Sequence, residues 1–199
     1  AFNDFNERAF QIPTGQRELL LRNSLHQLYE AVGPRWDVVL IDCPPSLDLI
    51  TTNALAAADD TLFPVKLESA SRTPFARLWT AAGEVKDAFN PDLDCIGIVG
   101  TFAQKGRRHS ADMSQWLREW FVEDLRWLVF DTSIRASDHV AQSHGQRLPV
   151  THLARRDKIR RCIGAEDFAA FAAEFVSRAE IGMPAATETT EDQRIASNA

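Results

Sequence analysis

Apolar residues follow two alternating patterns along the chain, and together they predict an α/β protein. Helical spacing of apolar positions predicts helices over residues 15–32, 73–89, 110–121 and 164–179, and the Ala- and Leu-rich run at residues 48–58 predicts another. Short apolar runs predict strands at residues 38–41, 61–65, 95–101 and 128–130. Strands that alternate with helices are typical of a sheet covered on both faces. We therefore expect a doubly wound, mostly parallel sheet.

The run Val38–Ile41 ends at Asp42, and Pro44 and Pro45 follow closely. In open α/β sheets, ligands bind beyond the carboxyl ends of the strands. A carboxylate at this position is suited to hold a hydrated Mg²⁺, which keeps several waters and needs one or two carboxylates. The two prolines stiffen the exit and make a plausible switch. The alternative for an apolar run plus Asp alone is a buried strand whose Asp caps the next turn.

The longer string around Asp42 resembles a known family. Val38-Val-Leu-Ile-Asp-Cys-Pro-Pro-Ser46 and Thr52-Asn-Ala-Leu-Ala-Ala-Ala-Asp59 are similar to the Walker B and switch II segments of the ParA/MinD-type deviant Walker ATPases. The resemblance implies a P-loop NTPase-like fold, ATP with Mg²⁺ as ligands, and ATP-dependent dimers that bind DNA. It assigns Asp42 to the water shell of the Mg²⁺ and Pro44 and Pro45 to the switch.

Two further segments match the same family. The strand ending at Thr101 and Phe102 occupies the place from which the family delivers residues near the nucleotide base. Asp131-Thr-Ser-Ile-Arg-Ala-Ser-Asp138 resembles the family's Asp-Thr-x-Ile-Pro-Arg segment, although no Pro separates Ile134 from Arg135. The resemblance therefore makes Thr101, Phe102, Ile134 and Arg135 the candidate base contacts.

The phosphate-binding glycine loop of such ATPases does not occur in the sequence. None of the nine glycines lies in G-x-x-x-x-G-K-[ST] or in the family's Lys-Gly-Gly-x-Gly-Lys-[ST] variant. The family carries this motif at its amino terminus, and the chain begins with Ala1 rather than Met. We expect a partial ParA-type ATPase domain over residues 1–179, incomplete at the amino terminus. This chain alone is expected to bind no cofactor and hydrolyse no ATP, while its parent protein hydrolyses ATP slowly.

Basic residues cluster despite a formal net charge of -6. The family binds DNA nonspecifically through surface Lys and Arg, and phosphate contacts of this kind carry affinity without reading sequence. The alternative is an ordinary solvated face. The candidate DNA-binding residues are Lys105, Arg107, Arg108, Arg155, Arg156, Lys158, Arg160 and Arg161.

Composition leaves two other functions open. The 45% hydrophobic and 25% charged residues are ordinary globular values, and Cys43, Cys95 and Cys162 show no metal-ligand spacing. We expect Cys43 to be a small buried residue. Residues 180–199 are polar and acidic, which predicts a disordered tail and argues against a MinD-like, membrane-associated regulator. The other alternative is a non-catalytic interaction module. The ParA-like hypothesis implies a cytoplasmic, nucleoid-associated protein without membrane contact, with DNA, a second copy and a ParB-like centromere-binding protein as partners in plasmid or chromosome partitioning.

Overall fold

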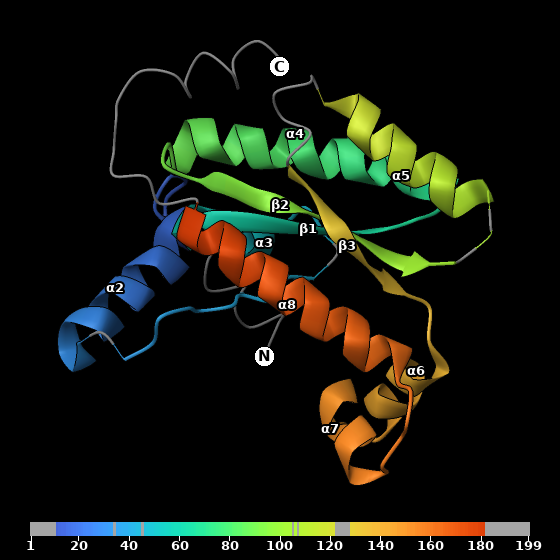
Figure 1. Ribbon diagram of the computed structural model, residues 1–199. Coiled ribbons are helices and arrows are strands. Elements are labelled where there is room, and N and C mark those ends of the chain that lie inside the picture. Colours follow the sequence, from blue (N-terminus) through green and yellow to red (C-terminus); the bar gives the residue numbers. More distant parts are fainter. Residues whose placement is uncertain are drawn as a thin grey trace. The chain divides into compact units, whose positions relative to one another are not determined.

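The computed structural model describes residues 11–33, 35–44, 46–104, 106, 108–121 and 128–181 (Figure 1). The chain divides into two compact units. Unit 1 comprises Ala1–Thr61 with Ala76–Asp94, and unit 2 comprises Leu62–Phe75 with Cys95–Ala199. The helices and strands largely follow the predicted alternation, and the α/β class is confirmed.

Unit 1 is helical, and hydrogen bonds from buried side chains hold its elements together. It contains the 3-10 turn η1 (Arg17–Leu19), α2 (Leu20–Val32), α3 (Leu49–Ala57) and most of α4 (Arg72–Phe89). The amide oxygen of Asn53 on α3 accepts from the backbone nitrogen of Leu21 at 3.0 Å, and its nitrogen donates to the carbonyl of Arg17 at 2.8 Å. Asn53 therefore joins α3 to η1 and α2 through a polar contact that an apolar side chain cannot make.

Unit 2 is built around a three-stranded sheet in the order β1-β2-β3. The strands are β1 (Asp60–Lys66), β2 (Asp94–Ala103) and β3 (Val129–Arg135), and β2 pairs with β3 in parallel. The register between β2 and β3 shifts twice, once between Ile98 and Gly100 and once between Thr101 and Ala103. A 3-10 turn, η2 (Ser69–Ser71), follows β1.

Helix α8 (Ile163–Ile181) packs along β3, as Figure 1 shows. Its Phe171 and Phe175 cover a core cluster formed by Val99, Phe130 and Ile134. Phe171 and Phe130 pack in a tilted arrangement, with ring centroids 5.0 Å apart and an interplanar angle of 59°. Phe171 and Phe175 thus belong to the core face of the helix, whereas Phe168 and Val176 are 40% and 52% exposed. The helix runs two residues past the predicted end at Ala179. Residues 182–199 of the predicted tail lie outside the described residues.

Within the described residues, unit 2 contains three further helices. Helix α5 (Arg108–Trp120) begins two residues before the predicted start at Ser110. The Ser110 hydroxyl instead accepts from the backbone nitrogen of Gln104 and donates to the carbonyl of Leu67. Helices α6 (Asp138–Gly145) and α7 (Val150–Arg156) were not predicted, because each is too short to show a helical period. Both contact α8, and Gly164 allows this close packing: a Cβ there would lie 2.5 Å from Cγ2 of Val140.

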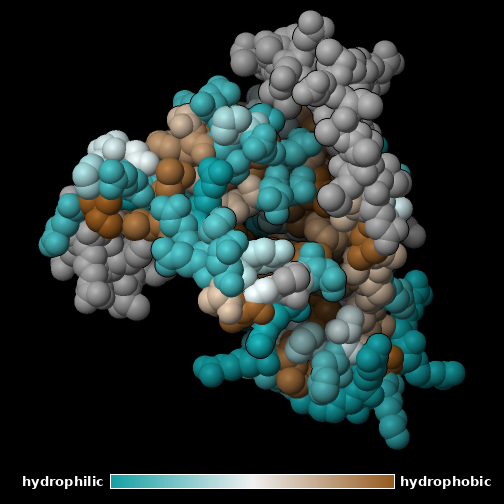
Figure 2. Space-filling view, turned by 90° about the vertical axis from the view of Figure 1, so that its left-hand side faces the viewer, coloured by the Kyte–Doolittle hydropathy of each residue, from teal (hydrophilic) through white to brown (hydrophobic). Residues whose placement is uncertain are grey.

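The prediction of a buried strand at residues 38–41 is wrong for this structure. The segment lies in no helix or strand, and Val38, Val39 and Leu40 are 60%, 58% and 80% exposed. Exposed apolar side chains are visible among hydrophilic ones in Figure 2. An apolar run becomes a buried strand when neighbouring strands pair with its backbone. Among the described residues no strand pairs with this run. Cys43, predicted to be buried, is also exposed.

Candidate functional site

The carboxyl ends of the three strands lie side by side in unit 2. The backbone nitrogen of Leu67, just after β1, donates to the carbonyl of Thr101 at 2.9 Å. Thr101 and Ala103 on β2 are register partners of Ile134 and Arg135 on β3. We call this row, Lys66–Glu68 with Thr101–Ala103 and Ile134–Arg135, the carboxyl edge. The structure thus brings together all four residues predicted to approach a nucleotide base.

Phe102 is the most exposed apolar side chain of the carboxyl edge. Its side chain is 58% exposed, and its φ of 53° lies in the left-handed region that residues with a Cβ seldom adopt. The strained residue falls at the register shift between Thr101 and Ala103. Lys66 at the end of β1 places its Nζ 5.3 Å from the centroid of the Phe102 ring and 3.0 Å from the Glu68 carboxylate. Backbone strain of this kind concentrates at ligand-binding positions.

Ile134 and Thr101, which were also predicted to contact a base, differ from Phe102 in what they offer a ligand. Ile134 is 7% exposed and belongs to the core cluster with Val99 and Phe130, so its side chain is not available at the edge. A contact between Ile134 and a base is therefore restricted to backbone atoms. Thr101 is partly buried, and its carbonyl is already bonded to Leu67. The pattern of the sequence did not distinguish these side chains from that of Phe102.

Arg135 is held by an acidic side chain from α8. Oδ2 of Asp167 lies 2.9 Å from the backbone nitrogen of Arg135, and its two carboxylate oxygens accept from Nε at 2.9 and 3.0 Å and from a terminal nitrogen. Burial opposes the ionisation of Asp167, but the hydrogen bonds and charge of Arg135 outweigh it, and the pKa of Asp167 lies below its ordinary value. The pair links the carboxyl edge to the first turns of α8.

Asp42 and the diproline lie in unit 1. Asp42 is exposed and forms no ion pair with a described residue, Pro44 is partly buried, and Pro45 lies outside the described residues. The segment leads into an anchored turn: the Ser46 hydroxyl donates to Oδ2 of Asp48 at 2.9 Å. Asp48 also caps α3 by accepting from the nitrogens of Ile50 and Thr51. The hydrogen bond from Ser46 is the main cause that lowers the pKa of Asp48.

A second candidate site, which we call the basic cluster, lies around α7. All its members are exposed: Arg155, Arg156, Lys158, Arg160 and Arg161. Arg156 is engaged, because it bonds Asp157 at 2.6 Å and the Gln146 side chain. In the described part of the chain, the other four form no ion pair with an acidic residue. Their charges are therefore open to an external anion.

Other predicted DNA contacts lie apart from the basic cluster in sequence. Arg108 is exposed at the start of α5, while Lys105 and Arg107 lie outside the described residues. Arg147, between α6 and α7, is an additional exposed cation of unit 2, with a left-handed φ of 54°. Its basic side chain was visible in the sequence, but its place between two short helices was not.

Neither a dedicated metal cage nor a membrane span is found in the described residues. No group of three or more His, Cys, Asp or Glu side chains there is arranged to hold a metal ion. None of the helices in the described ranges has both the length and the apolar character needed to cross a membrane. A Mg²⁺ that keeps its water shell needs fewer protein ligands than such a group supplies.

The fold is similar to that of solved α/β enzymes. Cobyrinic acid a,c-diamide synthase from Mycobacterium smegmatis superposes with a TM-score of 0.67 at 24% identity, over 95% of this chain and 64% of that one. The same enzyme with a bound ATP analog and magnesium gives a TM-score of 0.63 at 25% identity, over 90% and 60% of the two chains. The chain is thus an α/β protein of the P-loop NTPase-like class.

Sequence comparison gives the family. A family model described as an AAA domain matches residues 6–95. The sporulation initiation inhibitor protein Soj of Bacillus subtilis is 31% identical over 135 residues, which are 68% of this chain and 51% of Soj. The chromosome partitioning protein ParA of Caulobacter vibrioides is 30% identical over 165 residues, 83% of this chain and 58% of ParA. The chain belongs to the ParA/MinD superfamily and spans about half the length of these relatives.

Proposed function

We propose that the protein containing this chain is a ParA-type partitioning ATPase that binds ATP with Mg²⁺, dimerises and then binds DNA without sequence preference. The observation that carries the proposal is the carboxyl edge, where Phe102 and Arg135 lie on neighbouring strands at the end of the sheet where nucleotides bind in such folds. The similarity to ParA and Soj supports the same conclusion.

Residues of each unit, taken separately, support ATP with magnesium as the ligand. Asp42 offers an exposed carboxylate to the waters of Mg²⁺, and the carboxyl edge offers an aromatic ring and a guanidinium to a base. The phosphates need backbone N–H groups and a Lys, and the motif that provides them is not in these 199 residues. We therefore expect no ATP hydrolysis by the isolated chain and slow hydrolysis by the product of the complete reading frame.

The basic cluster supports DNA as the partner. Arg155, Lys158, Arg160 and Arg161 are exposed and unpaired among the described residues, in a chain whose net charge is -6. Local positive charge on an acidic protein favours a polyanion at that surface. The proposal includes a ParB-like centromere-binding protein as the stimulating partner and a cytoplasmic, nucleoid-associated location.

The test uses the product of the complete reading frame and measures binding to duplex DNA of random sequence with and without ATP. The double variant Arg160→Glu with Arg161→Glu is expected to lose DNA binding while its ATP affinity is unchanged. In the unaltered protein the logarithm of DNA affinity should fall steeply with the logarithm of salt, by about 0.9 for each phosphate neutralised.

The matched control is Arg77→Glu, which reverses an exposed charge on α4 outside the basic cluster. It should leave both affinities unchanged. DNA binding that is indifferent to the double variant and to salt would reject DNA as the partner. Failure of the complete protein to bind ATP would reject the ATPase and favour a non-catalytic interaction module.

A further inference from the structure

The planar guanidinium of Arg135 is fixed from one side. Asp167 accepts from Nε and a terminal nitrogen of the side chain, and also from the backbone nitrogen of the same residue. A carboxylate that bonds two nitrogens of the guanidinium and also the backbone nitrogen defines the plane of the guanidinium as well as its position. An arginine held in this way keeps one orientation, whereas an unpaired surface arginine samples many.

Burial shows which side of this pair faces solvent. Asp167 is 7% exposed, whereas the side chain of Arg135 is 36% exposed. The carboxylate therefore lies inside unit 2, and part of the guanidinium is presented outward at the carboxyl edge. Because each guanidinium face is flat and weakly hydrated, it stacks on aromatic rings.

The neighbouring strand presents a second flat group. Ala103 of β2 is the register partner of Arg135, and Phe102 immediately precedes it with a ring that is 58% exposed. An aromatic ring and an oriented guanidinium on adjacent strands suit a planar heterocycle with an anionic tail, such as a purine nucleotide.

We propose that Asp167 is a positioning residue, which orients the guanidinium of Arg135 so that the base of the nucleotide packs against it. The inference rests on the proposed function, since it assigns Arg135 to the nucleotide site. It adds a residue of α8, 32 positions away in the sequence, to the determinants of base affinity.

A second carboxylate on the same helix separates this role from simple helix docking. Glu174 also bonds the backbone of β3, at Asp131 and Thr132, in the part of the strand that precedes the carboxyl edge. If Asp167 merely docked α8 on β3, loss of either carboxylate would affect ligand binding alike. The proposal requires that they differ.

The experiment measures the affinity of the complete protein for ATP and for inorganic tripolyphosphate by calorimetry. Asp167→Ala is expected to weaken ATP binding by about two- to fivefold, the effect of one exposed cation–aromatic contact, and to leave tripolyphosphate binding unchanged. Asp167→Asn, which retains acceptor oxygen for the backbone nitrogen, should recover part of the loss. Glu174→Gln should change neither affinity.

Arg135→Lys provides an independent measurement if an Asp167 variant does not fold, because it keeps the charge and the ion pair but removes the planar fork. This variant too should weaken the binding of ATP and leave the binding of tripolyphosphate unchanged. Equal loss for both ligands, or unchanged ATP affinity in Asp167→Ala and Arg135→Lys, would overturn the positioning role while leaving the ATPase proposal intact. Failure of the unaltered protein to bind ATP would remove both.

Discussion

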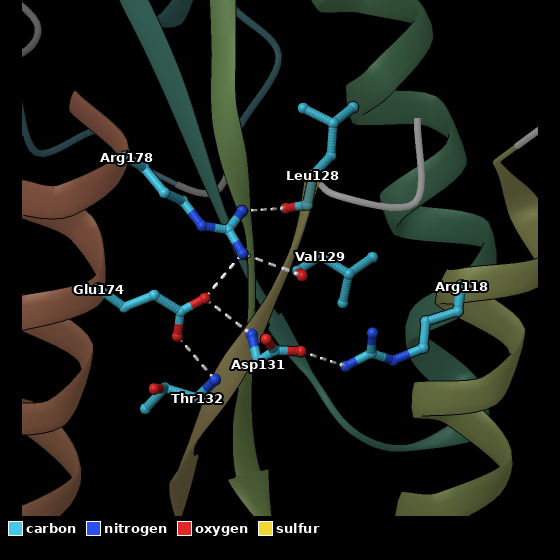
Figure 3. Close-up of polar contacts among 7 residues, drawn as sticks. All are labelled: Arg118, Leu128, Val129, Asp131, Thr132, Glu174 and Arg178. Atoms are coloured by element: carbon cyan, nitrogen blue, oxygen red, sulfur yellow. Dashed lines mark hydrogen bonds and ion pairs between the residues drawn. The ribbon is translucent and has the colours of Figure 1, made fainter. Parts of the chain in front are cut away.

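The carboxylate of Glu174 on α8 lies 2.8 Å from the backbone nitrogen of Thr132 on β3, and its other oxygen lies 2.9 Å from the nitrogen of Asp131 (Figure 3). These two nitrogens fall where the register between β2 and β3 shifts, so the regular ladder is interrupted there. A helix side chain thus satisfies backbone groups that a neighbouring strand would otherwise bond.

Arg178, one helical turn after Glu174, makes further hydrogen bonds from α8 to β3. It donates to the carbonyls of Leu128 and Val129 at 3.3 and 3.2 Å and to Glu174 at 2.7 Å, as Figure 3 shows. Its guanidinium carbon lies 3.8 Å from the centroid of the Phe130 ring. On the other side of β3, Arg118 of α5 reaches the Asp131 carboxylate at 3.3 Å. Because that contact is exposed, we expect it to contribute little to stability.

Removing the Glu174 carboxylate should therefore destabilise the fold. Glu174→Ala leaves two backbone N–H groups without their acceptor, and we expect the free energy of unfolding to fall by about 1–3 kcal/mol. Glu174→Gln retains an acceptor oxygen and should cost less. Urea denaturation of the 199-residue chain measures both. Glu84→Ala, an exposed change on α4, is the control and should be close to neutral. Equal stability of all three variants would show that the hydrogen bonds of Glu174 do not stabilise the fold.

Stability should also depend on pH through the carboxylates that bind β3. Burial opposes the ionisation of Asp167 and Glu174, but their hydrogen bonds and arginine partners outweigh it and lower the pKa of each in the folded protein. The unfolded chain therefore binds protons at a higher pH than the folded one. The stabilisation is complete above the unfolded pKa values and is lost as the pH falls through the lower, folded values.

The measurement is the free energy of unfolding between about pH 6 and pH 3, because stability falls with decreasing pH where the unfolded state binds more protons. The double variant Asp167→Asn with Glu174→Gln lacks both titrating carboxyl groups. Its free energy of unfolding should therefore decline less steeply as the pH falls. Parallel curves for the two proteins would show that these carboxylates do not couple protonation to folding.

The sequence predicted the elements whose determinants are local. Asp48 caps α3 as a residue directly before an Ala- and Leu-rich helix can, and β1 and β2 appear where short apolar runs fall. The exposure of Val38–Leu40 was not predictable in this way, because burial of an apolar run depends on partners elsewhere in the fold. The approach of Asp167 to Arg135 depends on α8 packing along β3, and Asp167 in sequence indicated nothing beyond a favourable charge near a helix start.

A buried amide in unit 1 gives a third prediction. Asn53 is 2% exposed and makes three hydrogen bonds, with the nitrogen of Leu21 and with the carbonyls of Arg17 and Leu49. Asn53→Ala should lower the free energy of unfolding by about 1–3 kcal/mol, because it removes the side-chain partner of the Leu21 nitrogen and of the Arg17 carbonyl. Asn53→Asp should be at least as costly, since a carboxylate cannot donate to the two carbonyls.

The control for Asn53 is Asn23→Ala, which removes the same side chain from an exposed position of α2. Its effect should stay within about 0.5 kcal/mol of zero. A thermal unfolding series on the four proteins is sufficient. Should Asn53→Ala unfold at the same temperature as Asn23→Ala, the polar link between α2 and α3 would contribute nothing to stability.

The largely exposed segment at residues 36–44 allows the nucleotide hypothesis to be tested without measuring activity. Trp36 and Leu40 are 61% and 80% exposed and lie in no helix or strand, so among the described residues chymotrypsin should cut the 199-residue chain first after these two. The bond after Leu153, fully buried in α7, should resist cleavage and serves as an internal control.

If Asp42 takes part in binding magnesium and ATP in the complete protein, the segment must be ordered around the ligand. ATP with Mg²⁺ should then slow cleavage after Leu40 in the complete protein, and Asp42→Ala should abolish this protection. Mass spectrometry of timed digests identifies the bonds that are cut. If the rate of cleavage in the complete protein is the same with and without ATP, this segment is not part of the nucleotide site.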